Sequence, residues 1–511
     1  MTGVDASAPG GDRFEPQHVV VIGGGMAGLV AALDCARVGI RVTVLEASDH
    51  LGGALRAEEI GGLTVEVGAE SFATRGGTVR ALAESVGLGD RIVTPNPEGA
   101  WVAAGKGRMA SLPKAGILGI PSSPLADDVR AVIGWGGALR AYLDRVMPVL
   151  TVGTEHDLGG LVTRRMGRAV RDNLVAPVTM GVYSSDPEAL DVTFAAPGLN
   201  RALTKAGSLS GAVATMRAAS RAGSNVEGIV GGMSVLVEAI VRELEHPWGV
   251  EIHRNTPVSA LERDGDGWLV TVTDTPGPDS DGSGTGETDS AIRADHVIVA
   301  IPEAPALGLL SRLDPSLSDV TPIDPPRVDL VTLVLDDSRL DAHPRGTGML
   351  VAPTAGLTAK AMTHATAKWS WLAENARALA PHRHVLRVSF GKAGENTVGE
   401  LGDDELVALA VRDLSTMLGV ELDPASIVAA KRTTWAGSLP GAVTGQRARS
   451  ESVRERILAI DGLDVTGGWL AGTGLAAVVP DALASAGRVR HRVAQRVLGE
   501  MAPDAAAPSA D

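Results

Sequence analysis

The stretch His18–Gly53 constrains the fold of this chain more than any other part of it. His18–Ile22 is a short, apolar, β-branched run that ends at a glycine, and it predicts a buried parallel strand. Gly23, Gly25 and Gly28 then follow as G-x-G-x-x-G. In that pattern the first glycine allows a tight turn, the second lets backbone approach a pyrophosphate, and the third lets helix and strand pack closely.

The residues after the glycines continue the same pattern. Ala27–Val38 predicts a helix whose N-terminus directs free N–H groups at a pyrophosphate. Arg41–Leu45 predicts the next strand, and Glu46 follows it at the spacing of an acid that binds a ribose diol. A glycine-rich turn in another kind of α/β protein is the alternative. The strand, helix and acid together favour a dinucleotide site.

A β-hairpin follows directly. Leu51-Gly52-Gly53 leads into Leu55–Ile60 and Leu63–Val67, which flank the turn Gly61-Gly62. This order resembles the large flavoprotein group of amine oxidases, phytoene desaturases and protoporphyrinogen oxidases. The resemblance implies FAD, held non-covalently, rather than NAD. It also implies an α/β fold with a Rossmann-like FAD-binding domain, an α+β substrate domain and an inserted helical subdomain.

Composition excludes several classes of protein. The 511 residues carry a net charge of −15, which argues against a nucleic-acid partner. A single cysteine, Cys35, excludes an internal disulfide framework, and its place in the first helix suggests simple packing. The N-terminus does not resemble a signal peptide, and no apolar run is long enough to span a membrane. We therefore expect a cytoplasmic protein, with peripheral membrane contact left open.

Breaks in the pattern suggest a discontinuous domain organisation. The predicted FAD-binding domain uses residues 17–105 (with the start of the substrate domain), 223–305 and 451–500. A mainly helical insert that faces substrate or membrane covers 106–222, and the α+β substrate domain covers 306–450. Residues 1–16, 274–290 and 501–511 are expected to be flexible.

Two local predictions depend on residues that end or begin helices and strands. Asn173–Leu190 suggests a helix that breaks at Pro177 and re-forms after a Ser/Asp cap. Near the C-terminus, Leu463–Thr466 and Trp469–Leu470 suggest short strands, followed after a glycine turn by a helix over Val479–Leu498.

Three phrases narrow the resemblance to bacterial porphyrinogen oxidases of the Gram-positive type. They are Gly181–Leu190, Trp435 followed by Leu439-Pro440-Gly441, and Gly231-Gly232-Met233. Gln446 departs from the family pattern, which usually has His there, and the segment Gly474–Asp481 has extra small residues. The likeness extends along nearly the whole chain.

The resemblance implies an activity. It is the conversion of coproporphyrinogen III to coproporphyrin III in haem biosynthesis, by three two-electron oxidations with dioxygen as acceptor and release of hydrogen peroxide. A ferrochelatase is the implied downstream partner, and protoporphyrinogen IX is the alternative substrate. Because the cofactor carries the redox chemistry, the protein needs to bind, orient and protect the tetrapyrrole rather than supply a nucleophile.

The resemblance and the motifs together give a set of candidate site residues. Gly181 is expected to present backbone to the macrocycle, the alternative being a glycine that ends a helix. Tyr183 either packs on the tetrapyrrole or fills the core. The candidate cations for substrate propionates are Lys106, Arg108, Lys114, Arg164, Arg165 and Arg168. The candidate cofactor-binding residues are Gly23, Gly24, Gly25, Met26, Ala27, Gly28, Glu46, Ala47, Gly53, Ala54, Gly68, Ala69, Glu70, Ser71, Val258, Trp435, Gly472, Ala477, Val478 and Val479.

Other functions remain open at this point. A flavin amine oxidase would share the FAD motifs but usually needs two aromatic rings beside the flavin; the chain has only two tyrosines, although Trp435 and Trp469 could substitute. A phytoene-desaturase-like enzyme and a flavin-binding scaffold without turnover are further alternatives. No metal site is predicted, because His382 and His384 lie in a strand-like segment without partnering acids and are interpreted as a solvated face.

Overall fold

A computed structural model describes residues 16–149, 154–218, 226–273, 289–395, 397–437 and 445–501. The segments expected to be flexible lie almost wholly outside these ranges, as does Leu439-Pro440-Gly441. Asp289 and Ser290, which the sequence had assigned to a flexible loop, instead begin strand β15 (Asp289–Ala294), because they pair with β14 (Gly267–Thr273).

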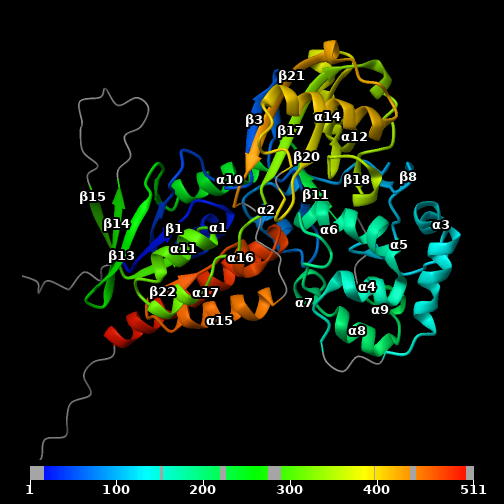
Figure 1. Ribbon diagram of the computed structural model, residues 1–511. Coiled ribbons are helices and arrows are strands. Elements are labelled where there is room, and N and C mark those ends of the chain that lie inside the picture. Colours follow the sequence, from blue (N-terminus) through cyan, green and yellow to red (C-terminus); the bar gives the residue numbers. More distant parts are fainter. Residues whose placement is uncertain are drawn as a thin grey trace, which may run out of the picture.

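The glycine motif lies in a five-stranded, fully parallel sheet (Figure 1, left). Its strands, in spatial order, are β12 (Glu251–His253), β2 (Arg41–Leu45), β1 (His18–Ile22), β16 (His296–Val299) and β22 (Leu463–Val465). Every residue of β1 is buried, because layers of structure cover both faces of the sheet. The predicted first and second strands, His18–Ile22 and Arg41–Leu45, are confirmed to the residue.

Alternate residues of β1 enter two different cores. Val19 and Val21 pack against helices α1 (Met26–Ala36), α10 (Ser234–Glu245) and α17 (Leu475–Met501). Val20 and Ile22 pack on the opposite face, against α11 (Glu303–Leu310) and the antiparallel sheet of β13 (Val258–Asp264), β14 and β15. Cys35 is fully buried in the first core, where desolvation raises its thiol pKa to about 12.

A seven-stranded mixed sheet forms the second unit (Figure 1, top). Its strands in order are β21 (Ile427–Trp435), β17 (Val328–Asp336), β20 (Arg383–Phe390), β19 (Ala361–His364), β18 (Gly348–Val351), β7 (Ala100–Ala104) and β8 (Arg108–Ser111). Helix α14 (Asp403–Leu418) packs on one face. The other face carries α12 (Ala365–Lys368), α13 (Ser370–Leu379) and the predicted hairpin of β3 (Ala57–Ile60) and β4 (Leu63–Glu66).

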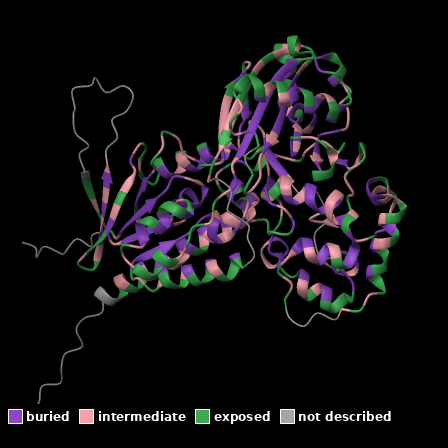
Figure 2. Ribbon diagram, in the orientation of Figure 1, coloured by how far each residue is buried: buried purple, intermediate pink, exposed green. Residues whose placement is uncertain are grey.

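Helices form the third unit, around a core of their own (Figure 1, right). They are α3 (Asp127–Tyr142), α4 (Leu158–Met166), α5 (Arg168–Val170), α6 (Ala176–Tyr183), α7 (Val192–Ala195), α8 (Leu199–Ala206) and α9 (Leu209–Ala218). Smaller elements complete the fold: α2 (Thr78–Ser85), α15 (Gln446–Leu458), and the short strands β5 (Phe72–Ala73), β6 (Ile92–Val93), β9 (Gly116–Ile117), β10 (Ile120–Pro121) and β11 (Val226–Ile229). Figure 2 shows that buried residues concentrate in the large sheets and on the inner sides of these helices. The exact domain boundaries stay a prediction.

The predicted helix break at Pro177 is wrong. A π-helical turn over Arg171–Val175 joins α5 to α6, and the chain stays helical through Pro177 to Tyr183. This turn already departs from regular i→i+4 bonding just before the proline, so the missing N–H does not end the helix. The helix ends instead at Ser184, which has a left-handed φ of 52°.

The predicted strand Trp469–Leu470 is also wrong. These residues belong to a short helix, α16 (Gly468–Ala471), between two glycines with positive φ, Gly467 and Gly472. The strand before it, β22, uses its hydrogen bonds on β16. Helix α17 then begins at Leu475, four residues before the expected start, and contains Pro480. None of the helices in the described part of the chain combines the length and apolar character needed to cross a membrane.

Buried histidine in the parallel sheet predicts acid sensitivity. His296 is 3% exposed, and desolvation lowers its pKa from 6.5 to about 4. Because the unfolded chain binds the proton more readily, stability should fall as the pH drops from 6.5 towards 4, by about 2 kcal/mol between pH 7.5 and 5 from this residue alone.

Urea unfolding at these two pH values tests the prediction, with His296→Phe as the non-titrating comparison. Neither ring nitrogen of His296 has a hydrogen-bond partner among the described residues, so phenylalanine removes no bond. The variant should lose less stability on acidification, and equal losses in the two proteins would contradict the assignment.

Candidate flavin and substrate site

One large cavity, of about 2260 Å³, connects all three units. The parallel sheet contributes its glycine turn and Glu46, the seven-stranded sheet contributes β18 and β19, and the helical unit contributes Gly181 and its neighbours. The cavity therefore begins at the carboxyl ends of the parallel strands, where α/β proteins bind their ligands.

The three motif glycines have different structural roles. Gly23 has φ 111°, and a Cβ atom on Gly28 would lie 1.9 Å from the carbonyl oxygen of Gly23, so both glycines are required by the turn itself. Gly25 has an ordinary extended conformation, and its Cβ position has no atom within 4 Å. Because Gly25 lines the cavity, the space beside it is what a pyrophosphate needs.

Glu46 stands at the cavity edge and ties two loops together. Its carboxylate accepts hydrogen bonds from the backbone N–H of Gly24 at 2.6 Å and of Ser48 at 2.9 Å. The Ser48 hydroxyl donates to the same carboxylate at 2.7 Å. These bonds fix the acid at the end of β2, where the sequence predicts an acid that binds a ribose diol.

A second corner of the cavity is built from closely packed backbone. A Cβ on Gly68 would lie 1.9 Å from the carbonyl oxygen of Ala54, and 3.2 Å from the ring of Trp435. The Trp435 indole N–H donates to the Val67 carbonyl at 2.7 Å, which holds the ring against this corner.

Glu70 pairs with two cations in the cavity wall. It forms ion pairs with Lys368 and, at 2.8 Å, with Arg387, which also donates to the Gly68 carbonyl at 2.6 Å. Burial alone would raise the pKa of Glu70, but the two cations outweigh it and lower that pKa to about 2. The triad therefore ties the glycine loop to β20 and α12.

Most of the predicted cofactor residues reach this cavity. Its lining includes Gly23, Gly25, Met26, Ala27, Glu46, Ala47, Gly53, Ala54, Gly68, Ala69, Glu70, Ser71, Val258, Trp435, Gly472 and Val478. Gly24, Gly28 and Ala477 lie off the lining, and Val479 is fully buried in the core behind it.

On the substrate side, the structure brings only some of the candidates to the cavity. Gly181 lines it, and a Cβ there would lie 2.7 Å from Cδ2 of Leu350. Lys114 also lines it, at an exposed position. Tyr183 packs against the core of the helical unit instead.

Lys106 lies in an exposed turn and Arg108 lies beside it. Neither residue lines the cavity. Arg108 donates to the Val132 carbonyl at 3.2 Å.

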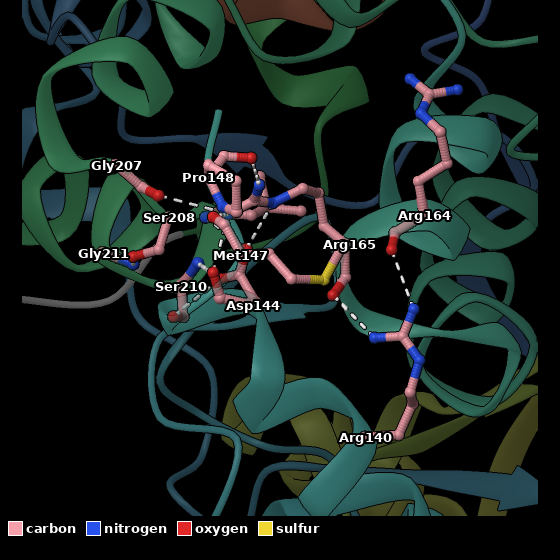
Figure 3. Close-up of polar contacts among 11 residues, drawn as sticks. Arg140, Asp144, Met147, Pro148, Arg164, Arg165, Gly207, Ser208, Ser210 and Gly211 are labelled. Atoms are coloured by element: carbon pink, nitrogen blue, oxygen red, sulfur yellow. Dashed lines mark hydrogen bonds and ion pairs between the residues drawn. The ribbon is translucent and has the colours of Figure 1, made fainter. Parts of the chain in front are cut away.

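Arg165 cannot bind a substrate propionate, contrary to the sequence-based hypothesis, because it is buried in a structural network (Figure 3). Its Nε donates to Asp144 at 2.7 Å, and its remaining nitrogens donate to the carbonyls of Asp144, Met147, Pro148 and Gly207. Asp144 in turn accepts the N–H groups of Leu209 and Ser210 at the start of α9.

The neighbouring arginines offer no better site for a propionate. Arg164 pairs with Glu155 at 2.5 Å, and Arg168 is exposed and lies off the cavity lining.

The expected solvated histidine face holds for His382, which is exposed, but is wrong for His384. His384 is buried, and both His384 and His382 bond to the carboxylate of Asp341, at 3.0 and 2.8 Å. The acid comes from a loop some forty residues earlier, which strand patterning could not reveal. Within the described ranges, no cluster of three or more metal-binding side chains has the geometry of a metal site.

Sequence reasoning missed Lys360, Lys368 and Arg387, which all line the cavity. Lys368 and Arg387 belong to the Glu70 triad, whereas Lys360 has no acidic partner in the part of the chain that the structure describes. A lysine within a β-patterned run, Lys360–His364, was the one available signal.

Comparison with known proteins decides the family. The model of the family "Flavin containing amine oxidoreductase" matches residues 26–498, which is most of the chain. The chain belongs to this family. The predicted FAD cofactor and oxidoreductase class are confirmed, and the glycine turn, Glu46 and the open space at Gly25 fit that cofactor.

Relatives within the flavin-containing amine oxidoreductase family span nearly the full length of this chain. Coproporphyrinogen III oxidase of Mycobacterium leprae is 30% identical over 92% of this chain and 96% of its own length. The Bacillus subtilis enzyme of that name is 25% identical over 90% of this chain and 95% of its own length.

Solved structures confirm the predicted fold class. A candidate protoporphyrinogen oxidase of Exiguobacterium sp. 255-15 has a TM-score of 0.76 and 25% identity, with 94% of this chain and 99% of that chain covered. Cyclohexylamine oxidase of Brevibacterium oxydans shares the fold, with a TM-score of 0.65 and 14% identity. The match covers 94% of this chain and 100% of that chain.

Gly25 provides a test of the cofactor cradle. Gly25→Ala should fold normally but weaken FAD binding by roughly tenfold or more, because the added methyl group occupies the space open to the pyrophosphate. Flavin absorbance after dialysis, with titration of FAD into the apoprotein, measures the effect.

Gly136→Ala is the matched control, since this exposed helical glycine also has no atom within 4 Å of its Cβ position. Unchanged FAD affinity in Gly25→Ala would mean that the pyrophosphate lies elsewhere.

Proposed function

We propose that this protein oxidises coproporphyrinogen III to coproporphyrin III in haem biosynthesis, with FAD bound at the glycine turn and dioxygen as the acceptor. Each porphyrin formed would consume three dioxygen molecules and release three molecules of hydrogen peroxide, so that six electrons and six protons balance. A ferrochelatase, which inserts iron into the porphyrin, would act downstream of this enzyme.

The observation that carries the proposal is similarity along the whole chain to coproporphyrinogen III oxidases of several bacteria. The cavity supports it, because 2260 Å³ accommodates a dinucleotide together with a second large ligand. Beyond the glycine turn the walls carry the apolar side chains of Leu174, Val178 and Leu350, which suit a flat macrocycle.

Bound FAD supplies the acceptor for each hydride. The protein's own contribution would be binding and orientation. The N-terminus of α1 and the Gly25 backbone would hold the pyrophosphate, and Glu46 would hold the ribose. Backbone around Gly181, opposite Leu350, would set the height of the macrocycle in the cavity. Its apolar walls would keep water away from the reacting carbon.

An amine substrate is less well supported. The described cavity lining has two aromatic side chains, Trp435 and Trp469, and both are held by hydrogen bonds to backbone carbonyls, of Val67 and Ile301. Neither tyrosine of the chain lines the cavity. Any pair of rings in the described lining that oriented an amine would therefore have to be Trp435 and Trp469.

The first experiment is aerobic oxidation of freshly reduced coproporphyrinogen III and protoporphyrinogen IX by FAD-loaded protein. We expect coproporphyrin fluorescence to rise faster than in the no-enzyme control, with peroxide released in a ratio approaching three per porphyrin. Preference for protoporphyrinogen IX would keep the porphyrinogen oxidase assignment but place the enzyme at a different step of haem biosynthesis. No acceleration with either substrate would reject the porphyrinogen assignment in favour of amines.

We also propose peripheral membrane contact by helix α3 for a protein that acts in the cytoplasm. Trp135, Leu139, Tyr142 and Val146 repeat at helical spacing along α3 and just after it, and all are exposed, Val146 to 73%. Arg130 lies over the Trp135 ring at 4.1 Å, and Arg145 lies over Tyr142 at 5.6 Å. An apolar stripe flanked by arginines suits the boundary between headgroups and acyl chains.

Vesicle flotation tests this contact. The triple variant W135S/L139S/V146S should reduce binding to phosphatidylglycerol-containing vesicles by roughly tenfold or more, because three apolar side chains no longer enter the bilayer surface. Leu379→Ser, at an exposed apolar position of α13, is the control and should bind as the unmodified protein does. If the triple variant floats as well as the control, α3 is not the contact.

A further inference from the structure

Lys360 is a buried cation on the wall of the cavity. It directly precedes β19, is 5% exposed, and lines the cavity near Gly181. Its backbone N–H donates to the Ser389 carbonyl at 2.9 Å, which ties the residue to β20. The position of the side chain is therefore set by two strands of the seven-stranded sheet.

The ammonium group of Lys360 has few partners. Nζ donates to the hydroxyl oxygen of Ser184 at 2.6 Å. Ser184 is itself buried, lines the cavity, and stands in a left-handed conformation at the end of α6. An ammonium has three donors, and among the described residues no carboxylate lies within ion-pair distance of this one.

The other cations of the described lining have an acidic or carbonyl partner or are exposed. Lys368 and Arg387 share Glu70. Arg217 donates to the Gly116 carbonyl at 3.0 Å, and Lys114 is exposed. Lys360 is thus the buried lining cation that lacks an acid. Because burying an unpaired charge is costly, an anion supplied by a ligand would offset the cost.

We infer that Lys360, with the hydroxyl of Ser184, forms a subsite for one carboxylate of the substrate and selects tetrapyrroles that carry a propionate at that position. This inference rests on the proposed function. Coproporphyrinogen III has a propionate on each of its four pyrrole rings, whereas protoporphyrinogen IX has vinyl groups on two of them. A subsite remote from solvent favours the substrate with acids on all sides.

The protonation of Lys360 supports this role. Desolvation lowers its pKa to about 7. The charged groups on the neighbouring elements are otherwise engaged: Asp413 of α14 accepts the N–H groups of Thr358 and Ala359, Arg387 of β20 pairs with Glu70, and Lys392 pairs with Asp186. A bound carboxylate would raise the pKa of Lys360 again, so binding above pH 7 should take up a proton.

The test uses FAD-loaded protein and the stable porphyrins as ligands, which separates binding from turnover. Lys360→Met should weaken coproporphyrin III binding by at least tenfold and change protoporphyrin IX binding less than twofold. Calorimetry at pH 8 in buffers of different ionisation enthalpy should detect uptake of close to one proton with the unmodified protein and none with Lys360→Met. Lys205→Met, at an exposed position of α8, is the control.

Two further variants distinguish an ionic role from a structural one. Lys360→Arg keeps the charge and should retain most of the coproporphyrin affinity. Ser184→Ala removes the hydrogen bond but keeps the ammonium, and should cost only a few-fold. Equal weakening of both porphyrins by Lys360→Met, or unchanged coproporphyrin III binding in that variant, overturns the inference. Failure of the oxidase assay with the binding pattern intact would reject the proposed reaction and keep the subsite.

Discussion

Close approach of backbone to backbone is the constraint on which this structure depends. A Cβ atom at Gly28 or at Gly68 would lie 1.9 Å from a carbonyl oxygen, of Gly23 and of Ala54 respectively. These contacts press α1 onto β1 and one loop onto another, whereas the Cβ position of Gly25, the middle glycine of the motif, is open. The cavity for the flavin exists because glycine allows its walls to pack this tightly.

Charge pairing then joins the units around that cavity. Glu70 comes from the loop after the hairpin, Lys368 from α12 and Arg387 from β20, so one carboxylate connects the glycine loop to the seven-stranded sheet. The desolvation of Glu70 is offset by its two cations, which is why its pKa falls despite burial. With one carboxylate for two cations, the triad keeps a net positive charge beside the glycine loop, whereas Lys360, nearer Gly181, has no carboxylate within ion-pair distance among the described residues.

Local patterns predicted what local interactions determine. The first strand, the second strand and the hairpin follow from alternation, β-branched residues and glycine turns, and the structure has them where expected. The environment of Arg165 could not be predicted, because its carbonyl partners come from two segments far apart in the sequence, Met147-Pro148 and Gly207. The same holds for His384, whose acid, Asp341, lies forty-three residues away in the sequence. Lys360 was missed because strand alternation does not reveal which face meets a cavity.

Arg165 and Lys360 show how two buried cations differ in purpose. Every guanidinium nitrogen of Arg165 donates to an oxygen of the protein, and its charge faces Asp144, so folding alone accounts for its burial. Lys360 is buried to a similar degree but donates to one neutral hydroxyl. Folding alone would favour an apolar residue there, as at Met362 two positions along the chain. An amine kept at such a position, where it can take up a proton, is explained by an anion that arrives from outside the protein.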